Sequence, residues 1–228
     1  EAIRRQMKQI WQYILKSVFL GPGLFYFGFI NAQGIKNVKV ERLTSENIKL
    51  ERGLSQNDVN TILQDRKGFL WFGTWDGLNK YDGYNFTVYK PNLKNRDKGI
   101  SHQSVNCIFE DRDGFIWVGT DRGLNKFDRK PQQFTQYKNT SVDSNNLIND
   151  TIRSITEDNE GNIWVGTHNG LNKYNKKTGG LVNFKHIPGN ENTIISNRIN
   201  QLYLDRQGRI WISTSAGLDI FYPETFDF

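Results

Sequence analysis

Short apolar and aromatic runs, separated by turn-forming residues, follow one another along most of the chain after residue 35. In one stretch they span residues 59–64, 69–74, 78–81 and 86–89, and they are rich in the β-branched and aromatic residues favoured in strands. Asp65 opens and Gly68 closes the turn between the first two runs, which suits a tight hairpin with a left-handed glycine. The pattern predicts an antiparallel sheet of four short strands, and no helix is expected after residue 35.

This unit repeats. The phrase Gly-x-x-Trp-x-Gly-Thr-x-x-Gly-Leu recurs with small changes, and its tryptophan stands at Trp71, Trp117, Trp164 and Trp211, at spacings of 46, 47 and 47 residues. A fixed period in the forties indicates stacked copies of one unit, and four-stranded sheets at this period are typical of β-propeller blades. We therefore expect an all-β fold over residues 35–228, with four four-stranded antiparallel blades at about 54–90, 100–138, 147–186 and 195–228.

In a propeller these four tryptophans have a structural role, because each lies on the second strand and fills the gap to the neighbouring blade. Residues 38–43 are expected to form a closing strand donated to the final blade. The fourth repeat, however, begins its own outer strand at 226–228, and both strands would compete for one place. An open array of blades leaves an unpaired apolar face, so we expect these blades to be part of a larger propeller.

Residues 1–34 have a different character. Basic residues near the start (Arg4, Arg5 and Lys8) precede an apolar stretch at 18–30 and then Asn31-Ala-Gln-Gly34. This is the order of a secretory signal peptide, and the segment from Ile10 is also long enough to be an uncleaved signal-anchor helix across a membrane. A buried amphipathic helix is the third alternative. A signal peptide or a signal anchor would keep the basic end in the cytoplasm and export the repeats.

Composition narrows the choice of partners. The net charge is +6, but residues 1–34 carry +3 of it, and the remaining charges are interspersed without a basic stripe. We therefore expect no nucleic-acid partner. The single cysteine, Cys107, excludes an internal disulfide framework, and its position on a first strand argues against a nucleophile.

Candidate binding residues lie where the repeats differ. Loops entering the first strand and turns joining the second and third strands emerge on the same face of a propeller, and the two residues before each Gly-Leu are the least repetitive of the phrase. Side chains of these types stack on and hydrogen-bond polar ligands such as saccharides. The candidate ligand-binding residues are Trp75, Asp76, Asp121, Arg122, His168, Asn169, Gln56, Asn57 and His102. The alternative is that they are ordinary solvated turn residues.

Catalytic chemistry is less well supported. A glycosidase needs two facing carboxylates, which Asp58, Asp76 and Asp121 could supply, and a lyase could use His102 or His168 as a base. The chain shows no nucleophilic triad order, metal-ligand spacing or phosphate-binding loop. We therefore assign no catalytic residue, metal or cofactor.

The repeated phrase Val-x-x-Ile-x-x-Asp-x-x-Gly-x-x-Trp-x-Gly-Thr-x-x-Gly-Leu-Asn-x-Tyr resembles the two-component regulator propeller repeat. The segments 53–59 and 81–86 look like the start of the extracytoplasmic sensor region of bacterial sensor histidine kinases, hybrid ones included. The resemblance covers roughly residues 35–228. It departs at Ser213 for Gly, Asp219-Ile220 for Asn-Lys and Ile152 for Val.

The resemblance implies a ligand-sensing input module of a membrane-bound two-component kinase, located at the bacterial cell membrane or exported, with the propeller on the extracytoplasmic side. Its partners would be a small polar ligand such as an oligosaccharide and, through the N-terminal helix, the membrane. No phosphoacceptor-histidine box, ATP lid or receiver pattern occurs in the chain, so kinase activity would belong to other parts of a parent protein. The alternative is an interaction scaffold whose propeller faces form a homodimer or hold a protein partner.

Overall fold

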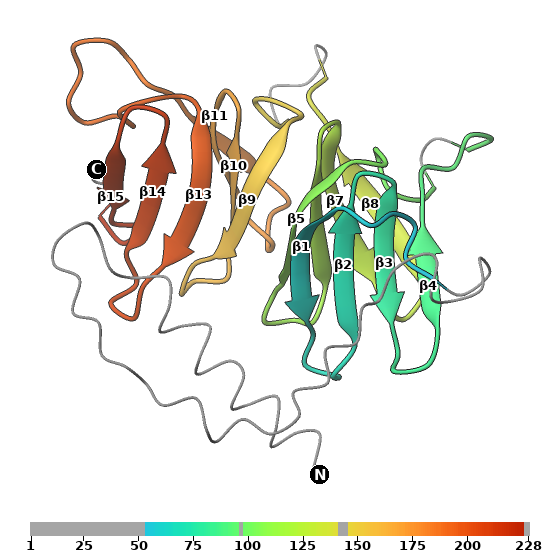
Figure 1. The fold of residues 1–228 in the computed structure, drawn as a ribbon. Helices are drawn as coiled ribbons and strands as arrows, with labels where there is room; N and C mark the ends of the chain where they lie inside the picture. The colour runs from blue at the N-terminus through green and yellow to red at the C-terminus, as the bar shows by residue number, and fades with distance from the viewer. Residues whose placement is uncertain (1–52, 96–97, 141–145, 226–228) are drawn as a thin grey trace, which may run out of the picture. The chain divides into compact units, whose positions relative to one another are not determined.

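The computed structural model describes residues 53–95, 98–140 and 146–225, which belong to the larger of two compact units, residues 42–228. These ranges contain fifteen strands and no helix (Figure 1). Within them, no helix is long and apolar enough to cross a membrane. The expected leader at 1–34, the closing strand at 38–43 and the outer strand at 226–228 lie outside the described residues.

Each repeat forms one antiparallel meander, which we call a blade. The first blade contains β1 (Val59–Gln64), β2 (Leu70–Thr74), β3 (Gly77–Tyr81) and β4 (Phe86–Tyr89). The second contains β5 (Val105–Glu110), β6 (Ile116–Thr120), β7 (Gly123–Asp128) and β8 (Gln133–Tyr137), and the third β9 (Ile152–Glu157), β10 (Ile163–Thr167), β11 (Gly170–Tyr174) and β12 (Leu181–Phe184). The fourth contains β13 (Ile199–Leu204), β14 (Ile210–Thr214) and β15 (Leu218–Phe221). The all-β, propeller-like expectation is confirmed, with three strands described in the fourth blade.

Successive blades pack through their first strands. β1 lies against β5, β5 against β9 and β9 against β13 (Figure 1). The apolar side chains between blades form three clusters, each drawn from two neighbouring repeats. The hydrophobic core of this part of the chain is therefore a series of blade interfaces.

The repeated tryptophans fill these interfaces, as expected. Trp71, Trp117 and Trp164 are fully buried. The Trp71 ring lies 5.7 Å, between centroids, from Phe127 of the next blade, and the other two repeat the contact with Tyr174 and Phe221 at 5.5 and 4.9 Å. Trp211, in the last described blade, is only partly buried.

The aspartate that opens each hairpin turn also binds the tryptophan. The Trp71 indole N–H donates to Asp65 Oδ2 at 2.7 Å, while the other carboxylate oxygen accepts the backbone N–H groups of Lys67 and Phe69. The same indole bond recurs in the other three blades at 2.8, 2.8 and 2.9 Å. One buried carboxylate thus fixes both the turn and the ring, a role that the turn chemistry alone did not predict.

Glycine after the tryptophan allows close contact between blades. A Cβ on Gly73 would lie 2.5 Å from Val105 Cγ1 of β5, and Gly119 and Gly166 meet Ile152 and Ile199 of the next blade at 2.6 and 2.5 Å. Because carbon atoms normally pack at about 3.5–4.0 Å, a side chain at these positions would push the blades apart. Ser213 stands at the corresponding position of the fourth blade.

Polar anchors hold the loops that enter each blade. The Asn79 side-chain oxygen accepts the backbone N–H of Ser55 at 2.8 Å, and Asn125 and Asn172 make the same bond one and two repeats later at 2.7 and 2.8 Å. A buried apolar residue precedes each anchored residue and completes the attachment; these residues are Leu54, Ile100 and Leu147. The entering loops are therefore held rigidly at the face where the sequence predicts binding.

Candidate functional site

A groove of about 620 Å³ lies on this face at the second blade. Its volume is typical of pockets for small molecules, about 300–1,000 Å³. The lining comes from the segment after β4, the loop entering the second blade, the β6–β7 turn, the end of β8 and the loop entering the third blade. The lining residues are Pro91, Asn92, Leu93, Ile100, Ser101, His102, Gln103, Asp121, Arg122, Lys138 and Asp150.

The groove brings together three of the nine candidate residues: His102, Asp121 and Arg122. The other six lie outside it. Gln56, Asn57, Trp75 and Asp76 belong to the first blade, and His168 and Asn169 to the third. The expected juxtaposition of entering loop and turn is still seen in the first blade, where the Trp75 backbone N–H donates to Gln56 Oε1 at 3.1 Å.

Neighbouring groups hold the polar side chains of the groove. Asp121 Oδ1 accepts a hydrogen bond from Asn106 Nδ2 at 2.8 Å, and the same amide donates to the Ile152 carbonyl of the next blade at 3.0 Å. His102 Nδ1 accepts the Ser104 backbone N–H at 3.2 Å, which places the ring proton of the neutral imidazole on Nε2.

The charged groups of the groove are not paired with one another. Asp150 Oδ1 accepts the Asn139 backbone N–H at 2.6 Å, a neutral partner. Among the described residues, Arg122 and Lys138 have no ion-pair partner. The groove therefore offers two cationic donors and two carboxylate acceptors beside the exposed apolar side chain of Leu93.

Two candidate residues of the first blade lie outside the groove. Trp75 does not line it, and no tryptophan, tyrosine or phenylalanine does. Asp76 forms an ion pair with Lys90 at 2.6 Å on the first blade. Of Asp58, Asp76 and Asp121, the aspartates that could supply a pair for hydrolysis, Asp121 lines the groove, and the other carboxylate there is Asp150.

His168 lies on the third blade, outside the groove. Partial burial lowers the pKa of its imidazole, and the positive charges of Arg153 and Arg198 lower it further. Its backbone N–H donates to the Thr151 carbonyl at 3.1 Å. The net shift favours the neutral imidazole, although the Asp121 carboxylate, the third charged neighbour, acts to raise the pKa.

Sequence reasoning missed most of the groove. Pro91, Lys138 and Asp150 follow or precede strands of three different repeats, and only the packing of blades brings them together. A signal was available for Asp150, since it stands two residues before a first strand, as Asn57 and Gln103 do. The described residues contain no group of three or more His, Cys, Asp or Glu side chains suited to a metal ion.

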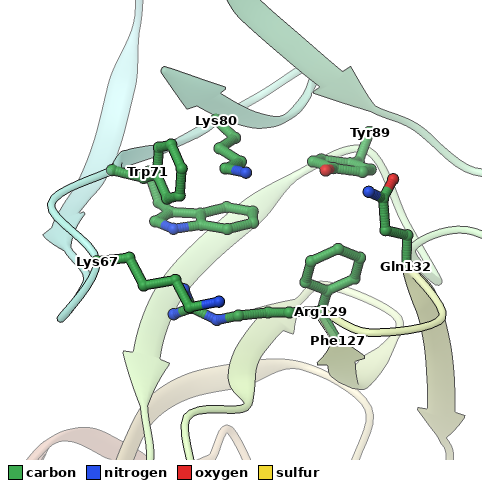
Figure 2. A pocket seen from close by; sticks show the side chains of 8 residues that line it. Lys67, Trp71, Lys80, Tyr89, Phe127, Arg129 and Gln132 are labelled. Atoms are coloured by element: carbon green, nitrogen blue, oxygen red, sulfur yellow. The ribbon is translucent and has the colours of Figure 1, made fainter. Parts of the chain in front are cut away.

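A second, smaller pocket of about 100 Å³ lies between the first and second blades. Figure 2 shows it beside the Trp71 ring, with the side chains of Lys67, Lys80 and Arg129 around it. The remaining lining residues are Phe69, Tyr89, Phe127 and Gln132. None of its residues was a candidate from the sequence.

Comparison with known proteins agrees with the repeat and the fold. The family model described as two-component regulator propeller matches residues 53–76, 99–122, 146–169 and 193–216. The chain carries four two-component regulator propeller repeats. Each match covers the loop that enters a blade, the first two strands of the blade and the start of the turn that follows them. The match at 99–122 therefore includes six of the residues that line the groove.

Some similar proteins are described as two-component systems or histidine kinases. The extracellular domain of BT3049 from B. thetaiotaomicron, described as a hybrid two-component system, is 28% identical with a TM-score of 0.60, over 79% of this chain and 31% of that one. The extracellular domain of BT4673 from the same organism, at 24% identity and a TM-score of 0.62, shows the fold alone; the match covers 74% of this chain and 22% of that one. A segment of 40 residues is 58% identical to Histidine kinase P4 of Formosa agariphila, 18% of this chain and 3% of that protein. The chain thus spans less than a third of each relative.

Proposed function

We propose that these blades are the extracytoplasmic ligand-sensing part of a membrane-bound two-component sensor histidine kinase, and that the groove at the second blade binds a saccharide or another small polar ligand. The observation that carries the proposal is the groove itself, which gathers His102, Asp121 and Arg122 from the loops that vary between repeats. The similarity to the extracellular domain of BT3049 supports the sensory role and the location outside the cytoplasm.

The groove suits a ligand rich in hydroxyl groups. A hydroxyl both donates and accepts hydrogen bonds. The Arg122 and Lys138 side chains donate only, whereas ionised Asp121 and Asp150 accept only, so adjacent hydroxyls could satisfy both kinds of group at once. Because cationic and anionic groups balance, the groove favours a neutral polyol or sugar over a multiply charged ion.

A sensor also needs a way to respond. A ligand shifts an equilibrium only if it binds two states with different affinity. The lining residues belong to the first, second and third repeats, from Pro91 through Arg122 to Asp150. A ligand that contacts all three would favour one relative placement of these blades, and this coupling could be transmitted to a kinase elsewhere in the parent protein.

A thermal-shift screen tests the proposal. The protein is heated with neutral mono- and oligosaccharides, and a ligand that binds the folded state raises the melting temperature with concentration. We expect Arg122→Ala and Asp121→Asn to abolish the rise. Arg198→Ala, which removes an exposed arginine at the loop entering the fourth blade, is the matched control and should keep it.

Other outcomes would replace the proposal. Absence of any saccharide response, together with a concentration-dependent dimer in sedimentation, would favour the interaction scaffold. Turnover of a polysaccharide that is lost in Asp121→Asn would favour an enzyme. A saccharide response that Arg122→Ala leaves unchanged would show that the ligand binds outside the groove.

A further inference from the structure

The pocket between the first and second blades lies next to an ion-pair cluster, and the corresponding cluster between the second and third blades has a different composition. At the interface of the second and third blades, Lys176 Nζ lies 2.6 Å from Asp113 Oδ2, 2.6 Å from Glu157 Oε1 and 3.6 Å from Asp111 Oδ2. Three carboxylates thus surround one cation, and Asp113 comes from the turn of the preceding blade. This cluster joins the two blades.

The first interface keeps two of these three carboxylates. Arg129 corresponds to Lys176, and its guanidinium lies 2.9 Å from Asp65 Oδ2 and 2.7 Å from Glu110 Oε1. The position of Asp113 is taken by Lys67, since the turn reads Asp65-Arg-Lys-Gly68 in place of Asp111-Arg-Asp-Gly114. A cation therefore stands where the repeat places the third carboxylate.

The cavity forms at this place. It is lined by Lys67, Lys80 and Arg129, and on the remaining sides by aromatic rings and by Gln132 (Figure 2). Lys80 Nζ lies 3.8 Å from the centre of the Phe69 ring, and neither Lys67 nor Lys80 has an ion-pair partner among the described residues. Among the described residues, Arg129 is thus the ion-paired cation of the cavity, and the third carboxylate that Lys176 contacts one repeat later is absent.

We propose that this pocket binds a small oxyanion, a carboxylate or phosphate, whose oxygens occupy the place of the missing Asp113-type carboxylate. The cavity volume is about 100 Å³, and a water molecule takes about 30 Å³ of liquid, so an anion the size of acetate or phosphate fits. The bound anion would join Lys67 of the first blade to Arg129 of the second, as Asp113 is joined to Lys176 at the next interface.

Thermal unfolding of the full 228-residue chain in a series of phosphate and acetate concentrations tests the proposal. A chloride series at equal ionic strength provides the reference, because phosphate also stabilises proteins by exclusion from their surface. We expect a saturable rise in the melting temperature with at least one of the two anions. Lys67→Asp places a carboxylate at the position that Asp113 occupies in the next interface. The half-saturating anion concentration should therefore rise about tenfold or more, and the melting temperature without anion should also rise.

Three variants control the interpretation. Lys177→Asp makes the same charge change at an exposed turn of the third blade and should keep the anion response. Lys67→Met removes the cation without adding a carboxylate and should lose the response even if Lys67→Asp folds poorly. Arg122→Ala should keep it, which separates this site from the saccharide groove.

The proposal is wrong if phosphate and acetate stabilise the protein no more than chloride does. It is also wrong if Lys67→Met responds as the unsubstituted protein does. A response that resists both Lys67 substitutions would place the anion elsewhere on the molecule.

Discussion

Replacement of Gly73 by alanine tests how closely the blades pack. The added Cβ would lie 2.5 Å from Thr61 Cγ2 and 2.5 Å from Val105 Cγ1. Since carbon atoms pack best at about 3.5–4.0 Å, each neighbour would have to withdraw by about 1 Å. Val105 is fully buried between two blades, so the withdrawal disturbs the whole interface.

The expected loss of stability follows from two opposing terms. Overpacking a well-packed core costs about 1–3 kcal/mol. Alanine also restricts the unfolded chain, which returns about 0.4–1 kcal/mol. The difference of the two ranges is about 0–2.6 kcal/mol, so Gly73→Ala should lower the free energy of unfolding by about 1.3 kcal/mol at their midpoints.

Urea unfolding followed by circular dichroism measures this loss as a lower midpoint with an unchanged slope. Gly180→Ala is the matched control, because its nearest atom is Thr178 Oγ1 at 3.2 Å, part of a small side chain in an exposed turn. It should stay within about 0.5 kcal/mol of the unsubstituted protein. Equal stability of the two variants would refute the close packing.

A double substitution locates the clash. Val105→Ala removes the Cγ1 atom that the new methyl group would meet. The pair Gly73→Ala and Val105→Ala should therefore cost less than the sum of the single changes, by about 0.5–3 kcal/mol. Strict additivity would show that the cost of Gly73→Ala arises somewhere other than the interface of the first two blades.

Three further predictions concern buried polar and titrating groups. Asp111→Asn leaves either the Trp117 indole N–H or a backbone N–H of the turn without its acceptor, so the free energy of unfolding should fall by about 1–3 kcal/mol; an unchanged urea midpoint would contradict this. Burial and the charge of Arg153 lower the pKa of His168, so its contribution to stability is present above its ordinary pKa and is lost as the pH falls through the folded-state value; Arg153→Gln should raise the pKa measured by NMR. Burial raises the pKa of the Cys107 thiol to about 12, so iodoacetamide at neutral pH should label it far more slowly in the native protein than in urea.

The fold could be predicted from the sequence because its signals are local. Each hairpin has its own turn residues, and the spacing of Trp71 and its three counterparts gives the number of repeats directly. The hydrogen bond from each indole to the turn aspartate was missed. Turn formation already explained the repeated aspartate and core packing the repeated tryptophan, so nothing in the pattern indicated that the two side chains contact each other.

For the candidate site, the sequence predicted the face of the blades on which it lies and not the set of residues that line it. Strand direction alone places His102 beside Arg122, because an entering loop and the next turn lie at the same end of a blade. Lys138 and Asp150 reach the groove from other repeats, at positions set by the length of the connections and the spacing of the blades. Period and turn chemistry carry no information about that spacing, so they could not show that Lys138 and Asp150 lie beside Arg122.

Ser213, which replaces the repeated glycine, limits what can pack against the fourth blade. At Gly73, Gly119 and Gly166 the position must be empty, because the next first strand places a β-branched side chain within 2.6 Å of where a Cβ would stand. Ser213 puts a Cβ and a hydroxyl at the corresponding place of β14, and this residue is partly exposed in the described part of the chain. Any element that packs against this side of the fourth blade must therefore lie farther away or present a smaller residue than Val105 or Ile152. If the expected larger propeller exists, its next interface therefore differs from the three described here.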